Sequence, residues 1–404
     1  MTHPFARLRR FRFNLPQRIA AGMLLLFLAQ GLWLTSRQTL SDRDYEYARC
    51  GRETWEKPSP LAGYYTSCGN IHDGILAYRL AGLPLTLNIL IERGLDRFRK
   101  PEDRVVQTGD VSRVSAWEMR HQLTHILLLL RLPFLAAGCI LGAGLWWVTR
   151  RLYGNMGGYL ALALYCFSPD VLRACVLPSP EILAALGIYG GIYTCIGVAH
   201  AMQGPRRKWR PRIVLLTASL SVAAAAHIAA LPVAALLGLV LMLWVAEGRR
   251  SQVLPVLMLS SVGALIFLFA CYGFSADAYS YVFRSAAGFL WYSLDPGRRF
   301  FSTLSNAGLT LAATASAVLY AVSRRSRYFG NTAPLLCFAV LVLLITTGVP
   351  ASPWFWSIPF LLTFLGGVFA DAFETKRSRM VLAAGGSLVG LQVVFCLLNL
   401  SGLL

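Results

Sequence analysis

Charge is scarce in this chain, and acidic charge most of all. Asp and Glu number 19 against 38 Lys and Arg, and charged residues make up only 14% of 404 positions. Hydrophobic residues make up 56%, and the mean hydropathy is +0.55. Soluble domains carry about 25% charged residues, so this composition excludes an ordinary soluble protein. It indicates a chain that crosses a membrane several times.

Several familiar motifs are missing as well. The sequence has no phosphate-binding loop, no Cys-x-x-Cys pair and no His-Glu-x-x-His. ATP-driven transport and serine-hydrolase chemistry therefore have no support. We also find no internal repeat. No small-residue cleavage site follows the first apolar run, near 19–35, so we expect a signal anchor there.

The basic residues gather in short clusters between apolar segments. Clusters of this kind mark the cytoplasmic loops of membrane proteins. Of the 19 acidic residues, 16 lie on the other side, and only Glu247, Asp371 and Glu374 do not. The pattern predicts a cytoplasmic N-terminus, and anionic lipids rather than nucleic acid explain much of the net charge of +19. The clusters cover positions 7–18, 150–151, 206–212, 249–250, 324–327 and 376–379.

We expect an all-α polytopic membrane protein with about eleven transmembrane helices. Residues 1–17 would form a basic cytoplasmic N-terminus, and 18–404 a single transmembrane domain with a helical outer loop over 37–123. Within that loop, residues 74–100 carry leucines at helical spacing followed by basic residues, which predicts an interfacial helix broken near Pro84. The spans are predicted near 18–36, 124–148, 156–169, 180–201, 212–227, 229–246, 253–273, 304–322, 332–348, 353–370 and 380–401.

Two further expectations concern packing and covalent structure. Gly138 and Gly142 stand four residues apart in an apolar segment, which predicts close packing of helices. Cys50 and Cys68 both fall in the first outer loop. They would form a disulfide in an oxidising compartment, and two free thiols are the alternative.

One part of the chain follows the order of a known superfamily. It reads Arg131-Leu132-Pro133, a span, Arg-Arg-Leu-Tyr-Gly over 150–154, a short Ala-rich span, Ser168-Pro169, and an outer turn that ends in Glu181. Upstream, Tyr47-Ala48 and Arg52-Glu53-Thr54 follow an acidic segment. Over about residues 15–250 this resembles GT-C glycosyltransferases, the class of protein O-mannosyltransferases and lipid A aminoarabinose transferase. The family usually has Asp-Glu where this chain has Arg43-Asp44.

The resemblance implies a GT-C glycosyltransferase fold and activity. Such an enzyme moves a sugar from a polyprenyl-phosphate donor to a lipid, glycan or protein acceptor on the outer, periplasmic face, with inversion and a carboxylate base. A degenerate GT-C-like scaffold stays open because the acid pair is altered. A carrier or flippase of lipid-linked glycans also stays open, although carriers typically show repeats and ionisable groups at mid-membrane.

The resemblance also implies which carboxylates would act. The acceptor's proton must pass to an ionised carboxylate. Asp44 is the predicted base, because it follows the first span where the loop turns back over the membrane, and Asp42 and Glu46 are alternates. Glu181 would orient the acceptor or the base. The simpler readings are a solvated charge run for Asp42 and Asp44, and a helix-dipole contact for Glu181.

A leaving phosphate needs cationic partners, and Arg is the best of them because its guanidinium binds two oxygens at once. The candidates are Arg131, Arg79, His72, Arg298 and Arg299. Arg131 lies just inside the membrane edge, where an ionisable group indicates function by default. Snorkelling of its side chain to the interface is the alternative.

No cofactor is required by these residues, although a divalent cation has one candidate site. Glu118, His121 and His125 recur at helical spacing and would share one helix face. Histidines at a membrane interface with no metal are the alternative. The expected partners are a polyprenyl-phosphate-linked sugar, an acceptor and membrane lipids, without nucleic acid.

Overall fold

The structure is a computed structural model that describes residues 14–56, 68, 71, 73–96, 123–205, 209–286, 306–343, 353–375 and 378–400. Within these ranges every regular element is a helix. The helices are α1 (Leu15–Arg37), α2 (Asp42–Glu56), α3 (Ile75–Asp96), α5 (Leu123–Cys166), α6 (Pro169–Val176), α7 (Pro180–Met202), α8 (Arg210–Ala226), α9 (Ala230–Val245), η4 (Arg250–Gln252), α10 (Val253–Cys271), α11 (Ala276–Ala286), α13 (Ala307–Val322), η6 (Arg324–Ser326), α14 (Phe329–Leu343), α15 (Pro353–Phe373) and α16 (Ser378–Leu400).

The apolar helices are suited to a membrane. Six of them are long and apolar enough to cross one: α1, α5, α7, α10, α15 and α16. Four shorter apolar helices, α9, α13, α14 and the first part of α3, accompany them. The chain is therefore an integral multi-pass membrane protein, as expected. The count of eleven spans stays a prediction.

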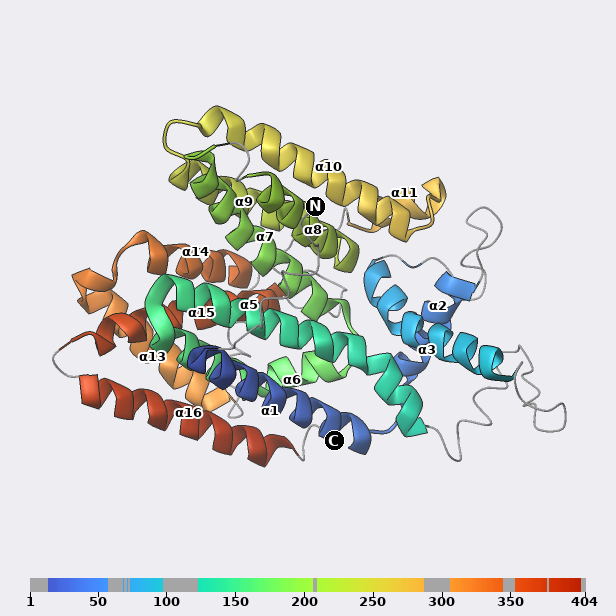
Figure 1. Ribbon diagram of the computed structural model, residues 1–404, viewed down its shortest axis with the longest axis horizontal. Coiled ribbons are helices and arrows are strands. Elements are labelled where there is room, and N and C mark those ends of the chain that lie inside the picture. The colour runs from blue at the N-terminus through green and yellow to red at the C-terminus, as the bar shows by residue number, and fades with distance from the viewer. Residues whose placement is uncertain are drawn as a thin grey trace, which may run out of the picture.

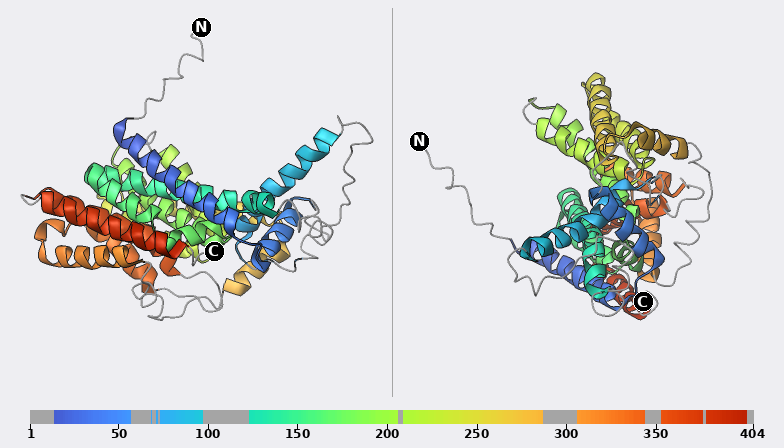
Figure 2. Two further views of the ribbon diagram at one scale, coloured as in Figure 1. Left: turned by 90° about the horizontal axis from the view of Figure 1, so that it is seen from below. Right: turned by 90° about the vertical axis from the view of Figure 1, so that its right-hand side faces the viewer.

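The helices run lengthwise beside one another, with α10 along one side of the bundle and α1 and α16 along the other (Figure 1). Helix α15 lies in the middle, and its apolar side chains are almost all buried. Helices α2 and α3 sit at one end of the bundle, and the perpendicular views in Figure 2 show α3 projecting beyond it. We call this the α2/α3 end. The opposite end carries the turns at Gly154, η4 and η6.

Helix α5 contains two of the predicted spans. It breaks at Gly154, whose φ of 82° and ψ of −176° lie outside the helical region. Glycine adopts a positive φ readily because it has no Cβ. The basic pair Arg150 and Arg151 lies just before the break. Gly154 lies between the predicted spans 124–148 and 156–169, so the helix breaks in the interval that separates them.

The predicted packing role of Gly138 and Gly142 is confirmed. A Cβ atom at Gly138 would come within 2.4 Å of Cys175 Sγ, and one at Gly142 within 2.8 Å of Tyr165. Side chains larger than hydrogen would therefore push α5 away from its neighbours. Glycine at these positions lets the helices approach closely.

The first outer segment is a helical pair. Helices α2 and α3 cross where Gly51 faces Gly82, and a Cβ at Gly82 would lie 2.1 Å from the Gly51 backbone. The predicted break near Pro84 is wrong, because α3 continues through this proline. Proline removes one backbone hydrogen bond from the helix. The tight contact between Gly82 and Gly51 of α2, two residues before Pro84, supports α3 next to the missing bond.

The predicted disulfide is confirmed: Cys50 and Cys68 are bonded, with Cα atoms 5.7 Å apart. It ties the middle of α2 to the segment that precedes α3. The proposed division into residues 1–17 and 18–404 stays a prediction, since residues 1–13 lie outside the described ranges.

Candidate functional site

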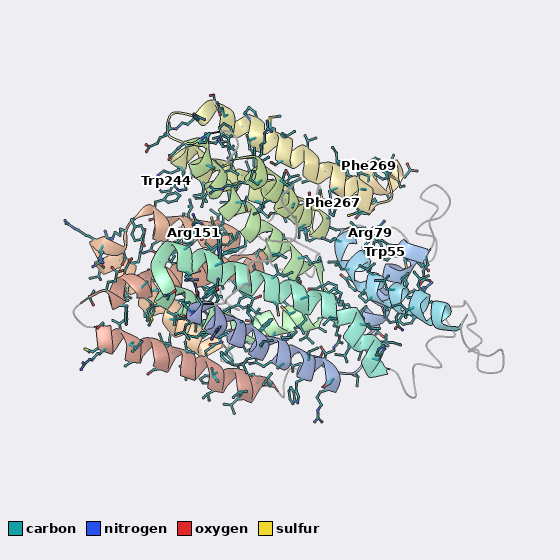
Figure 3. The ribbon with its side chains drawn as sticks, viewed as in Figure 1. Trp55, Arg79, Arg151, Trp244, Phe267 and Phe269 are labelled. Carbon is teal, nitrogen blue, oxygen red and sulfur yellow. A yellow bond between two sulfur atoms is a disulfide. The ribbon has the colours of Figure 1, made fainter. Side chains whose placement is uncertain are left out.

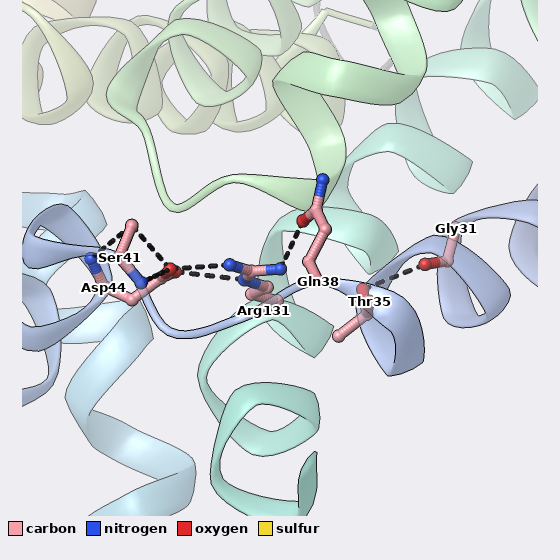
Figure 4. A network of polar contacts seen from close by, with 6 residues as sticks. All are labelled: Gly31, Thr35, Gln38, Ser41, Asp44 and Arg131. Atoms are coloured by element: carbon pink, nitrogen blue, oxygen red, sulfur yellow. Dashed lines mark hydrogen bonds and ion pairs between the residues drawn. The ribbon is translucent and has the colours of Figure 1, made fainter. Parts of the chain in front are cut away.

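A buried ion pair joins α2 to α5 at the α2/α3 end (Figure 4). Arg131 donates from Nε to Asp44 Oδ1 at 3.0 Å and from Nη2 to Asp44 Oδ2 at 2.6 Å. Its Nη1 donates to Gln38 Oε1. The Asp44 side chain is fully buried, and that of Arg131 is 2% exposed. Charges removed from water in this way persist only when they are paired.

The same carboxylate caps α2. Asp44 Oδ2 accepts hydrogen bonds from Ser41 N at 3.0 Å and from Ser41 Oγ at 2.7 Å, while Asp44 N donates back to Ser41 Oγ. This reciprocal pattern is a capping box. Asp44 as the catalytic base stays a prediction. Its surroundings favour a positioning role, because donors already occupy both oxygens and the side chain is inaccessible.

The neighbouring residue, Arg43, faces a different carboxylate. Arg43 and Glu181 lie close enough for their charges to interact, and Tyr47 interacts electrostatically with both. Arg43 hydrogen-bonds Tyr47, and its guanidinium lies 5.9 Å from the centre of that ring. Arg43 and Glu181 are both half-buried. The fold thus brings a cation from the first turn of α2 beside a carboxylate from the first turn of α7.

Two stacked tyrosine rings lie next to Arg43 and Glu181. The rings of Tyr47 and Tyr78 lie 4.2 Å apart and within 7° of parallel, and Tyr78 donates from its hydroxyl to Glu46 Oε1 at 2.7 Å. Burial raises the pKa of Tyr47 to about 12, so its hydroxyl stays protonated at neutral pH. The stack fixes α2 on α3 and leaves the Glu46 side chain exposed.

A second carboxylate contact ties three segments together. Asp73 Oδ1 accepts hydrogen bonds from Gly74 N at 2.9 Å and Ile228 N at 3.0 Å, and Asp73 Oδ2 lies 3.0 Å from His227 Nδ1. Burial raises the pKa of Asp73 and lowers that of His227. Both shifts favour the uncharged forms, and the attraction between the two groups opposes them.

Arg79 serves the structure of this end rather than standing open to a ligand. It donates from Nε to the Cys271 carbonyl at 2.6 Å, and its guanidinium lies 5.1 Å from the Trp55 ring. Trp55 in turn donates from Nε1 to the Arg79 carbonyl. Figure 3 shows the two side chains together between α2, α3 and the end of α10. Arg79 as a phosphate partner stays a prediction.

The remaining predicted residues divide into two groups. Asp42 lies exposed at the start of α2, and His125 lies exposed near the start of α5. His72, Arg298, Arg299, Glu118 and His121 lie outside the described residues. Among residues that the structure does describe, no three His, Cys, Asp or Glu side chains gather into a site for a metal ion.

Sequence reasoning missed three features of this end. Arg131 was assigned to phosphate, but its partner Asp44 lies 87 positions earlier in the chain. Arg43 entered only as a departure from the family pattern, although its charge interacts with that of Glu181. Asp73 was not expected to meet His227. Only the register of Arg43 against the usual acidic pair could have drawn attention to it.

Comparison with known proteins supports the fold. No protein-family model and no curated protein sequence matches the chain. Among solved structures, ArnT from Cupriavidus metallidurans in the apo state is similar, with a TM-score of 0.57, 13% identity, and coverage of 89% of this chain and 62% of that one. Two structures of the Archaeoglobus fulgidus oligosaccharyltransferase are also similar. The form with Zn and sulfate has a TM-score of 0.52 and 12% identity, and the match covers 94% of this chain and 52% of that one. The apo form has a TM-score of 0.51 and 11% identity, and the match covers 96% of this chain and 54% of that one.

These likenesses identify an architecture. ArnT and the archaeal oligosaccharyltransferase are both GT-C proteins, so this chain has the GT-C fold of multispanning membrane glycosyltransferases. The chain spans between half and two thirds of the length of each matched structure. At these identities the likeness establishes the fold, and activity must be argued from the residues.

Proposed function

We propose that this protein is a membrane glycosyltransferase that moves a sugar from a polyprenyl-phosphate donor to a lipid, glycan or protein acceptor. The observation that carries the proposal is that Arg43 and Glu181 lie close enough for their charges to interact, at the α2/α3 end of a GT-C fold. A cation and a carboxylate side by side supply the two groups that such a transfer needs.

Glu181 is the base that we favour among the predicted carboxylates. It is half-buried, whereas Asp44 is enclosed by Arg131 and the capping box. It stands in the first turn of α7, where the helix dipole favours a negative charge. A base must lie within reach of the acceptor, and the half-buried Glu181 meets this condition better than the enclosed Asp44 does.

Arg43 is the cation that we assign to the donor phosphate. Arg131 is occupied by Asp44 and Gln38, and Arg79 by a backbone carbonyl and Trp55. Arg43 is half-buried on the ring of Tyr47, which holds its guanidinium on the Glu181 side of α2. A guanidinium in that position would neutralise charge that builds up on the departing phosphate.

The proposed reaction is a single displacement at the anomeric carbon. A lone pair of the acceptor oxygen or nitrogen attacks C1 of the sugar as the bond from C1 to the phosphate oxygen breaks. Glu181 takes the acceptor's proton, and the polyprenyl phosphate leaves with the electrons of the broken bond. The configuration at C1 inverts, because the acceptor enters opposite the leaving group.

The orientation follows from charge. The opposite end of the bundle carries Arg150, Arg151, Arg249, Arg250 and the arginines of η6. Basic loops stay in the cytoplasm, so the α2/α3 end would face the outer side, with the N-terminus in the cytoplasm. The Cys50–Cys68 disulfide supports this orientation, because disulfides persist in oxidising compartments.

A GT-C-like scaffold without activity is the second candidate. The observation that favours it is Arg43 itself, which stands where the related enzymes usually carry an acid. If a base at that register is indispensable, the chain binds lipid-linked sugars without transferring them.

The experiment is transfer of radiolabelled sugar from polyprenyl-phosphate donors in proteoliposomes. We expect the wild-type protein to transfer above protein-free liposomes. Arg43→Gln should lower the rate at subsaturating donor by about 10- to 100-fold, the value of a hydrogen bond to a charged group. The matched control is Arg52→Gln, since Arg52 lies on the same helix but pairs with Glu56 at 2.8 Å. No transfer by the wild type with any donor would favour the scaffold.

A further inference from the structure

Three segments far apart in sequence meet beside the start of α7. Asp73 precedes α3, His227 lies in the turn between α8 and α9, and Trp356 lies in the first turns of α15. His227 Nδ1 is 3.0 Å from Asp73 Oδ2, and the rings of His227 and Trp356 are 5.2 Å apart, edge to face. The proposed mechanism uses none of these side chains.

The segment that carries Asp73 packs against the segment that carries Glu181. A Cβ at Gly74 would lie 3.3 Å from Pro180 and 3.5 Å from the Ala226 carbonyl. Pro180 is the residue directly before Glu181, and Ala226 is directly before His227. The segments that carry Asp73 and His227 therefore meet at the start of α7, next to the residue that precedes the proposed base.

Two buried polar atoms there have no hydrogen-bond partner among the described residues. Trp356 is 1% exposed, yet its Nε1–H finds no hydrogen-bond acceptor among the described residues. Ser179, which precedes Pro180, is 2% exposed, and its Oγ finds none there either. Buried polar groups nearly always have partners, and leaving one without costs about 1–3 kcal/mol. An indole N–H and a hydroxyl in this state point to a ligand that supplies the missing partners.

The chemistry of the cluster selects the ligand. Asp73 keeps 23% of its side chain exposed and accepts hydrogen bonds. Trp356 donates, while Ser179 can do either. A phosphate diester only accepts hydrogen bonds, so it offers no donor to the acceptor oxygens of Asp73. A sugar hydroxyl, which donates and accepts at once, fits donors and acceptors that stand together.

We propose that Asp73, His227 and Trp356 form a subsite that binds hydroxyl groups of the transferred sugar. The backbone N–H groups of Gly74 and Ile228 fix the Asp73 carboxylate, and that carboxylate orients the His227 ring. The proposal rests on the proposed function. It adds that the sugar ring lies on the α3/α8/α15 side of Glu181, while Arg43 meets the phosphate on the α2 side.

The test compares binding of two lipids to the full-length protein in nanodiscs. One is undecaprenyl phosphate, and the other is undecaprenyl phosphate that bears glucose, galactose, mannose or 4-amino-4-deoxyarabinose. Trp356→Phe keeps the ring and removes the N–H. It should weaken binding of the glycosylated lipid about tenfold, the value of one hydrogen bond, and leave undecaprenyl phosphate unchanged. Asp73→Asn should act in the same way.

A matched control is available in Trp146, a second buried tryptophan whose Nε1 has no acceptor among the described residues. It lies beside Arg150 at the opposite end, so Trp146→Phe should change neither affinity. Equal loss for both lipids in Trp356→Phe, or no loss for the glycosylated lipid, would overturn the subsite and leave the proposed function standing. Failure of the wild-type protein to bind any glycosylated lipid would instead overturn the proposed function.

Discussion

The two ends of the bundle handle charge in opposite ways. At the α2/α3 end, Asp44 and Arg131 form a pair with side chains no more than 2% exposed. At the opposite end, the ion pair of Arg325 and Glu374 has side chains 56% and 63% exposed. Buried charges hold a fixed geometry at a cost in desolvation, whereas exposed pairs contribute little. Fixed geometry is what a reaction site needs.

Three other arginines of the opposite end lie over tryptophan rings. Arg150 lies 5.1 Å from the Trp146 ring, Arg151 5.4 Å from Trp147, and Arg249 5.5 Å from Trp209. Tryptophan and arginine together are typical of a membrane–water interface. Figure 3 locates the two ends, with Arg79 and Trp55 at one and Arg151 and Trp244 toward the other. In our proposal this end anchors and orients the bundle, and the α2/α3 end carries the chemistry.

The sharpest way to break this comparison is to test on which side each end lies. Asp42→Cys at the α2/α3 end and Glu374→Cys at the opposite end both replace exposed side chains. In right-side-out vesicles a membrane-impermeant maleimide should label only Asp42→Cys, and Glu374→Cys only after detergent opens the vesicles. The unsubstituted protein gives the background. The reverse pattern would contradict the orientation.

The two ion pairs should differ in stability. Asp44→Asn leaves the Arg131 guanidinium buried without its counter-charge, so we expect a loss of about 3–5 kcal/mol in the free energy of unfolding. Glu374→Gln breaks the exposed pair and should cost about 0–1 kcal/mol. Denaturant unfolding of both variants in the same detergent measures the difference. Equal losses would show that burial does not distinguish the two ends.

The Cys50–Cys68 disulfide tests how much a covalent link adds to the stability of the α2/α3 end. Replacing Cys50 and Cys68 together by Ser releases a loop of 18 residues, for which chain entropy predicts a loss of about 3 kcal/mol. The control is Cys139→Ser, a free and half-buried cysteine of α5. The readout is denaturant unfolding with and without reductant. Reductant should destabilise the wild-type protein and leave the double variant unaffected.

The smallest expected effect lies at the opposite end. Arg249→Gln removes the cation from the Trp209 ring, and we expect a loss of about 0.5–1 kcal/mol. The Trp209 fluorescence and the unfolding free energy report it together. A loss as large as that of Asp44→Asn would mean that this end, too, depends on a fixed charge geometry.

Hydropathy and charge in the sequence predicted the helical bundle better than they predicted the contacts of the candidate site. Spans, the turn at Gly154 and the close packing at Gly138 and Gly142 follow from local composition, and the disulfide from the shared loop. The predicted helix break at Pro84 was wrong, because the effect of a proline on a helix depends on its neighbours. Here the neighbour is α2, which packs against α3. The helices α6 and α11 were not expected, since short helices leave only a weak periodic signal.

The site was harder because its contacts join distant positions. Nothing local marks Asp44 and Arg131 as partners, and the family register placed them in separate roles. The same holds for Asp73 and His227, which meet only because the α8/α9 turn packs against the segment before α3. The motif drew attention to Glu181, but Arg43, the neighbour on which its proposed role depends, emerged from the fold.

The central claim is that Glu181 accepts the proton at the α2/α3 end while the ion pair of Asp44 only fixes the geometry. The most direct measurement is single-turnover transfer by Glu181→Gln, with donor binding measured on the same proteoliposomes. The account predicts an unchanged dissociation constant and a rate lowered by about 10²-fold or more, because the amide keeps the shape and cannot take a proton. Transfer by Glu181→Gln at the wild-type rate would contradict it.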